Sequence, residues 1–163
     1  MRFLRVILVL AVAVSATACS KFKSYDGPEV TQIVVQKSQR RMYLLHNQEV
    51  LKSYDIGLGF APEGHKKIEG DGKTPEGMYF IDRRNPNSNY HLSIGISYPN
   101  PVDRMAAADL GKSPGGDIFI HGRPWKDRKG GRDWTAGCIA VTNREMEDIY
   151  AMVRNGTPIS IAP

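Results

Sequence analysis

The sequence predicts a mainly β protein, a compact β-sandwich or barrel-like domain with one or two short helices. Stretches rich in β-branched or alternating apolar residues recur along the chain, separated by clusters of glycine, proline and asparagine. Two other stretches carry helix signals. The length of 163 residues, of which 41% are hydrophobic and 24% charged, suits one globular domain and excludes collagen-like, disordered and multi-domain chains.

The expected strands follow one another along the chain, and tight turns join the first three. A stretch at 60–77 is rich in glycine and predicts a long ordered loop before the fourth strand. The expected strands are 30–35, 41–45, 49–57, 78–82, 90–98, 117–120, 138–141 and 158–162.

Capping residues predict the two helices. Asn100 can cap a helix at 101–110, and Gly111 can end it. Thr142 and Glu145 form a capping box for a second helix near the end of the chain. Its predicted buried stripe, at spacings of i, i+3, i+4 and i+7, consists of Met146, Ile149, Tyr150 and Val153.

The first residues have the features of a secretion signal. Arg2 and Arg5 precede an apolar run at 6–14, and small residues lead up to Cys19. The run is too short to span a membrane comfortably. We therefore expect residues 1–18 to be a signal peptide that is removed on export to the periplasm.

Two processing routes are open at this junction. Ala16 and Ala18 satisfy the A-x-A rule of ordinary signal peptidase, which would release a soluble periplasmic protein. Cys19 directly after Ala18 resembles a bacterial lipobox, although Ala16 stands where leucine is usual, and Ser20 resembles an outer-membrane address. We favour lipidation of Cys19, with residues 19–29 as a lipidated or flexible tether and with membrane contact only through that lipid.

Charge and cysteine content exclude several classes of protein. The net charge of +5 falls by two when Arg2 and Arg5 leave with the signal, and no basic stripe with interleaved aromatic residues points to nucleic acid. Two cysteines are too few for a disulfide framework. If Cys19 is lipidated, Cys138 has no partner.

The surroundings of Cys138 suit a nucleophile. Gly137 precedes it at a loop-to-strand junction, while His121 ends another expected strand and is followed by Gly122. If the two strands are neighbours in one sheet, His121 can take the thiol proton and lower the pKa of Cys138 from about 8.5 toward neutral, giving a thiolate that attacks carbonyl groups. The alternative is a buried core thiol, since free cysteine packs as a small hydrophobe.

A zinc site is the rival interpretation of these residues. The histidines at 46, 65, 91 and 121 are scattered, with neither H-x-x-x-H nor C-x-x-C spacing. We therefore expect no metal and no cofactor.

These residues resemble the motifs of a known family, the YkuD-type L,D-transpeptidase catalytic domains of bacteria. The family pattern is His-Gly, a loop and then Ser/Thr-x-Gly-Cys, which here reads His121-Gly122 and Thr135-Ala136-Gly137-Cys138. Upstream, 72–77 resembles the family's Thr-Pro-x-Gly segment, and 92–100 resembles a stretch of a Gram-negative branch. The resemblance spans about 30–162, so we expect residues 30–163 to form this catalytic domain.

The resemblance implies a role for each motif residue. Cys138 would be the nucleophile and His121 its general base and acid, with the backbone carbonyl of Gly122 orienting the imidazole. The amides around Gly137 and Cys138 would form the oxyanion hole, where losing one donor costs about 100-fold or more in rate.

Residues near the motif are candidates for substrate binding. Trp125 and Trp134 could pack against a peptide stem, Arg123 and Arg132 could attract its carboxylates, and His91 could point into the cleft. The alternative for the charged residues is a solvated loop, and His91 fits a structural role at least as well.

The resemblance implies a periplasmic cysteine acyl transferase acting on diaminopimelate-containing peptidoglycan stem peptides. The thioester on Cys138 would pass to a second stem as a 3-3 cross-link, to a wall-linked lipoprotein, or to water in a carboxypeptidase or amidase reaction. Ala136 stands where most members have a second histidine, and Ala140 where many have arginine, so the acceptor stays open. A non-catalytic wall-binding lipoprotein is a further alternative.

Overall fold

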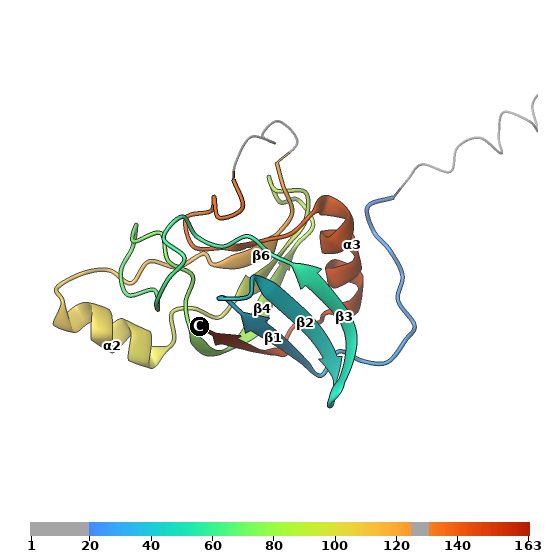
Figure 1. Ribbon diagram of the computed structural model, residues 1–163, viewed down its shortest axis with the longest axis horizontal. Coiled ribbons are helices and arrows are strands. Elements are labelled where there is room, and N and C mark those ends of the chain that lie inside the picture. The colour runs from blue at the N-terminus through green and yellow to red at the C-terminus, as the bar shows by residue number, and fades with distance from the viewer. Residues whose placement is uncertain (1–19, 125–130) are drawn as a thin grey trace, which may run out of the picture.

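The computed structural model describes residues 20–124 and 131–163. Within these residues, eight strands form one sheet in the order β3-β2-β1-β8-β4-β5-β6-β7. Figure 1 shows the sheet curling round, with α2 and α3 at opposite ends of the molecule. The strands are β1 (Gln32–Gln36), β2 (Arg41–His46), β3 (Glu49–Asp55), β4 (Gly77–Asn85), β5 (Ser93–Ile96), β6 (Phe119–His121), β7 (Ile139–Ala140) and β8 (Pro158–Ala162).

The pairing of the strands combines hairpins with two parallel contacts. β1 pairs antiparallel with β2 and parallel with β8, so the last strand of the chain lies beside the first. β8 also pairs with β4, which continues through β5 and β6. β6 and β7 are parallel neighbours, and this contact brings the two motif strands together.

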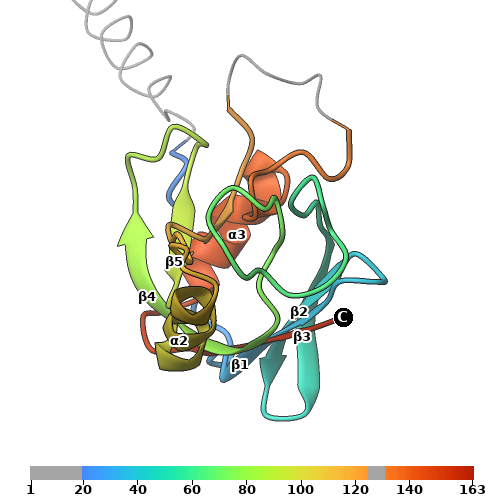
Figure 2. The same cartoon turned by 90° about the vertical axis from the view of Figure 1, so that its left-hand side faces the viewer.

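The core occupies the concave side of the sheet. Alternate residues of the early strands are buried, as the period-2 pattern predicts: Ile33 and Val35 from β1, and Met42 and Leu44 from β2, are each 0% exposed. Figure 2 shows α3 in the middle of the curl, with β4 and β5 on one side and β2 and β3 on the other.

Both helices begin at the predicted caps. α2 (Pro101–Asp109) has Asn100 as its N-cap, and α3 (Asn143–Met152) has Thr142, each with a complete capping box. α3 buries Met146, Ile149 and Met152. Tyr150, which we expected in that stripe, is only half-buried; it packs against the rim of the core, and the guanidinium of Arg84 lies 3.8 Å from its ring centroid.

The predicted class is confirmed, since the described residues form eight strands and two helices. The expected strand at 90–98 is shorter than predicted, because β5 covers only Ser93–Ile96. His91 has a φ of 74°, a left-handed conformation that ends the ladder on that side.

The segment that follows Cys19 packs onto the domain. Lys21 donates to the backbone oxygens of Pro86 and His91, at 2.7 and 3.1 Å. Lys23 pairs with Asp148 of α3 at 2.7 Å. The predicted signal peptide and the lipidation candidate Cys19 lie outside the described residues, and no helix within those residues is long and apolar enough to cross a membrane.

Candidate active site

Cys138 and His121 lie at the edge of the sheet where β6 and β7 pair. The parallel register places Ile120 beside Ile139 and His121 beside Ala140, so Cys138 lies directly before the paired residues of β7. His121 and Cys138 line one cavity of about 450 Å³, which we call the Cys138 cavity. It is lined by Asn85, Ser88, Asn89, Tyr90, Ser93, Asp117, Phe119, His121 and Cys138.

The thiol of Cys138 is held by backbone groups of the strand beside it. Its Sγ accepts a hydrogen bond from the Phe119 N–H at 3.4 Å and donates to the Asp117 carbonyl at 3.5 Å. This geometry describes a protonated thiol whose proton faces a carbonyl oxygen. A carbonyl is only an acceptor, so the proton must turn away before any transfer to an imidazole.

His121 is fixed in one tautomer. Its Nδ1 lies 2.6 Å from the carbonyl oxygen of Gly122, and because a carbonyl only accepts, Nδ1 carries the proton. Nε2 is then left with a free lone pair, as a general base requires. The ring lies between Tyr90, with centroids 4.4 Å apart, and Trp134, with centroids 5.6 Å apart in an edge-on arrangement.

Electrostatics keep both groups neutral in the resting site. Burial raises the pKa of the Cys138 thiol, and the carboxylate of Asp117 adds to the rise, although the Phe119 N–H opposes it. Burial and the charge of Arg123 lower the pKa of His121, against the effect of the Gly122 carbonyl. The prediction of a thiol pKa lowered toward neutral is therefore wrong for the unliganded site, because desolvation exceeds the local stabilisation of a thiolate.

A turn formed by Thr135 shapes the nucleophile loop. The Thr135 hydroxyl accepts from the Gly137 N–H at 3.1 Å and donates to the Cys138 carbonyl at 2.7 Å. The Gly137 N–H, which we expected to face an oxyanion, therefore already has a partner. Among the hydrogen bonds of the described residues, none uses the Cys138 N–H, which makes that amide the better candidate donor.

Glycine is required at position 137. Gly137 has a φ of +133°, and a Cβ there would lie 2.7 Å from the carbonyl oxygen of Lys73. Lys73 belongs to the stretch at 72–77 that the sequence likened to a family motif. Its neighbour Thr74 accepts the Gly59 N–H at 3.1 Å, so this stretch supports the nucleophile loop from behind.

Gly122 also stands where a side chain would not fit. A Cβ at this position would lie 2.4 Å from Oδ1 of Asn143 and 2.9 Å from the carbonyl oxygen of Tyr90. The same Oδ1 accepts from the Arg123 N–H at 2.7 Å. Asn143, the first residue of α3, thus fixes the turn whose carbonyl orients His121.

The predicted substrate-binding residues separate into different places. Trp134 contacts His121, and the Arg123 guanidinium lies 5.5 Å from the centroid of the Trp134 ring. His91 points elsewhere, because its Nε2 lies 2.9 Å from Glu147 on α3, and Trp125 lies outside the described residues.

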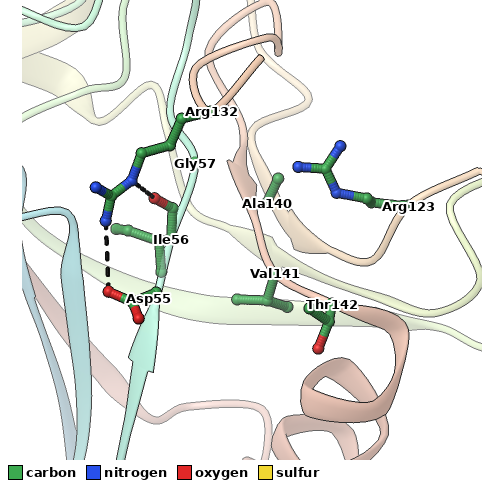
Figure 3. Close-up of a pocket in the computed structure, with 8 residues that line it drawn as sticks. All are labelled: Asp55, Ile56, Gly57, Arg123, Arg132, Ala140, Val141 and Thr142. Atoms are coloured by element: carbon green, nitrogen blue, oxygen red, sulfur yellow. Dashed lines mark hydrogen bonds and ion pairs between the residues drawn. The ribbon is translucent and has the colours of Figure 1, made fainter. Parts of the chain in front are cut away.

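Arg123 and Arg132 line a second hollow of about 370 Å³, which we call the arginine hollow (Figure 3). Figure 3 shows their guanidinium groups on either side of the methyl group of Ala140. The two hollows share no lining residue, so these arginines are not part of the wall of the Cys138 cavity. The lining includes Asp55, Gly57, Arg123, Arg132, Ala140 and Thr142.

The sequence did not assign a role to Tyr90, Thr135 or Asn143. Thr135 had a usable signal, because a threonine two residues before a glycine in a loop is typical of a side-chain-stabilised turn. Asn143 and Tyr90 had none, since their contacts join segments far apart in the chain. Among the described residues, no group of three or more His, Cys, Asp or Glu side chains is placed to hold a metal ion.

The chain is thus a curled-sheet domain in which the half-buried Cys138 and the buried His121 line one cavity beside a glycine-shaped loop. The model of the YkuD family, described as the L,D-transpeptidase catalytic domain, matches residues 30–161. The chain therefore belongs to the YkuD family of L,D-transpeptidase catalytic domains.

Named relatives agree with this assignment. The chain is 30% identical over 132 residues to the protein named "Putative L,D-transpeptidase YafK" of Escherichia coli K12, a match that covers 78% of this chain and 48% of the relative. The chain thus spans about half the length of that curated relative.

Solved structures are similar in fold. The helical cell shape determining protein Pgp2 of Campylobacter jejuni is 27% identical with a TM-score of 0.65, over 93% of this chain and 54% of that one. L,D-transpeptidase 1 of Mycobacterium tuberculosis, at 16% identity and a TM-score of 0.53 over 81% of this chain and 61% of that one, shares the fold.

Proposed function

We propose that this protein is a cysteine acyl transferase that acts on peptidoglycan stem peptides. The observation that carries the proposal is the shared cavity of Cys138 and His121, in which Nδ1 is occupied by the Gly122 carbonyl and Nε2 is free. The neutral polar side chains of Asn85, Ser88 and Asn89 line the same cavity and suit the hydrogen-bonding groups of a peptide.

The first half-reaction forms a thioester. The Cys138 proton moves to Nε2 of His121 as Sγ bonds to the carbonyl carbon of the third stem residue, and the carbonyl oxygen becomes an oxyanion near the Cys138 N–H. The peptide C–N bond then breaks, and the imidazolium returns its proton to the leaving amine. Because both groups start neutral, the thiolate forms only when the Cys138 proton passes to His121 within this half-reaction.

The second half-reaction depends on the acceptor. An amine of another stem gives a 3-3 cross-link, and a lysine of a wall-linked lipoprotein gives attachment. His121 removes the amine proton, the new C–N bond forms, and the C–S bond breaks as the thiolate recovers a proton. Water as the acceptor gives hydrolysis instead. Ala136, which is exposed on the nucleophile loop, favours this second candidate, because its methyl side chain offers no polar group that could hold an acceptor amine.

Export and anchoring complete the proposal. Residues 1–18 would direct the chain to the periplasm, where its substrate lies, and lipidation of Cys19 would hold it at the outer membrane. The Lys21 and Lys23 contacts begin two residues after that cysteine, so an anchored chain would keep its domain close to the membrane.

The test is incubation of the purified protein with isolated sacculi, followed by mass spectrometry of the released fragments. New 3-3 dimers would establish transpeptidation, and freed tripeptides or freed lipoprotein without dimers would establish hydrolysis. Cys138→Ala is the control. Fragment patterns that are identical for the two proteins would contradict both reactions and leave a non-catalytic wall-binding role.

A further inference from the structure

The arginine hollow is a candidate binding site separate from the nucleophile. Its volume of about 370 Å³ lies in the range of sites for small ligands or single side chains. Ala140 lies between the two arginines, and because its side chain is one methyl group, it leaves the space between their guanidinium groups open (Figure 3). The hollow therefore has space for a small ligand group between two arginine side chains.

The balance of charge in the hollow is positive. Arg132 is partly engaged, since its Nε donates to the Ile56 carbonyl at 3.3 Å and a terminal nitrogen lies 3.4 Å from Oδ1 of Asp55. Within residues 20–124 and 131–163, Arg123 makes no ion pair. Among the described lining residues, two cations thus face a single carboxylate, and that carboxylate is 73% exposed.

Arg123 connects the hollow to the reacting residues. It follows Gly122, whose carbonyl holds His121, and its backbone N–H is fixed by Asn143 at 2.7 Å. Its guanidinium lies against Trp134, which packs edge-on to the His121 ring. A ligand bound to Arg123 would therefore lie close to Trp134, the residue that packs against His121. The Cys138 cavity would stay free for the carbonyl group that reacts.

We propose that the arginine hollow binds a carboxylate of a peptidoglycan stem peptide, with Arg123 as its main contact and Arg132 as a second. The guanidinium fork matches the two oxygens of a carboxylate, and such charge-assisted pairs are among the strongest hydrogen bonds in proteins. This inference rests on the proposed function. The carboxylate belongs to the acyl donor or to the acceptor stem, and the experiment separates these two sources.

The experiment compares a synthetic stem peptide with the same peptide carrying amides in place of its free carboxylates. The donor arm measures the rate of thioester formation on the full chain in a single turnover. The acceptor arm measures how fast the preformed thioester is consumed as the concentration of acceptor peptide rises. The proteins are wild type, Arg123→Gln, Arg123→Lys and, as a matched control, Arg104→Gln on the distant helix α2.

We expect Arg123→Gln to weaken use of the carboxylate peptide by about tenfold in one arm and to abolish its advantage over the amide there. Arg123→Lys should keep part of that advantage, because it retains charge but not the fork. Asp55→Asn should increase the preference for the carboxylate peptide over the amide peptide about twofold, since a competing carboxylate is removed. Arg104→Gln should behave as wild type. The arm that responds identifies the source of the carboxylate.

An Arg123→Gln protein that keeps the full preference for carboxylate over amide in both arms would overturn the proposal. Failure of the proposed function is a different result, in which wild type forms no thioester with either peptide. In that case, calorimetric titration of the carboxylate peptide into wild type and Arg123→Gln still decides. Loss of binding in Arg123→Gln supports the hollow, and equal binding overturns it.

Discussion

The two ends of the sheet are built in different ways. At one end, β1, β2 and β3 contain five, six and seven residues and pair in long antiparallel ladders, and β1 and β2 bury alternate residues while β3 is mostly exposed. At the other end, β5, β6 and β7 contain only four, three and two residues. Here polar side chains bond to backbone groups, as Thr135 does with the loop of Cys138 and Asn143 with the turn after His121.

This difference teaches how stability and function are divided. A regular ladder tolerates most substitutions that keep its pattern of buried and exposed residues. Its backbone hydrogen bonds alone do not fix the position of one sulfur atom relative to one imidazole. Side chains that bond to specific backbone groups can fix a turn with that precision. We therefore expect substitutions at the ladder end to change stability, and substitutions at the site end to change activity.

The largest expected effect is that of Gly137→Ala. The new Cβ would press on the Lys73 carbonyl at a φ that favours glycine, which displaces the Cys138 N–H. We expect at least about a 100-fold loss of thioester formation. Gly156→Ala is the matched control, because Gly156 also has a positive φ, of 91°, but nothing lies within 4 Å of its added Cβ. Equal losses of activity in the two variants would contradict this account.

Leu44→Ala tests the ladder end. Leu44 is 0% exposed in β2, and its truncation leaves a cavity that costs about 3 kcal/mol of the free energy of unfolding. Denaturant titration measures this loss. Activity per folded molecule should stay at the wild-type value, and a large fall in that specific activity would show that the two ends are not separable.

Thr135→Val tests the site end with a smaller change. Valine keeps the shape but removes both hydrogen bonds of the hydroxyl, so we expect about a tenfold slower reaction with about 1 kcal/mol of lost stability. Thr135→Ser should recover most of the rate. Thr31→Val at the ladder end removes two comparable bonds, to the Leu45 carbonyl and the Asn47 N–H, and should lower stability alone.

The smallest expected effect is a pH dependence of stability. The pKa of folded His121 is below its ordinary value, so the unfolded chain takes up a proton first as pH falls. The neutral histidine therefore contributes stability above pH about 6.5 that is lost as pH falls from there through the folded pKa. Melting temperatures between pH 7 and 5 should fall more for wild type than for His121→Gln, and equal slopes would rule out this contribution.

Many of the strands at the ladder end could be predicted from the sequence, because a strand buried on one face has apolar residues at every second position. The caps of both helices, Asn100 and Thr142, were predicted for a similar reason, since each signal lies within four residues of chain. Within the site, the sequence placed Gly137 and Cys138 at a loop-to-strand junction because that signal is local, and β7 does begin directly after Cys138. The placement of Tyr90 on His121 was not predicted, because it depends on a contact between a turn and a strand that are 31 positions apart in the sequence.

The charged residues show the same limit. Arg123 and Arg132 were predicted to attract the carboxylates of a peptide stem, and that role stays a prediction. Their position needed the fold, because they line a hollow that shares no lining residue with the Cys138 cavity. The sign of the thiol pKa shift also needed the fold. A histidine on a neighbouring strand favours a thiolate, and only the desolvation of Cys138 in the folded protein raises its pKa instead.

The most direct test of the Cys138 and His121 assignment is the rate at which Cys138 becomes acylated by a stem peptide or a carbapenem, followed by intact-protein mass between pH 5 and 9. We predict one adduct, absent in Cys138→Ala, that forms more slowly once the pH falls through the pKa of folded His121, which burial holds below its ordinary value. His121→Gln should slow it by about 100-fold or more and remove that dependence. Acylation of His121→Gln at the wild-type rate would contradict the account.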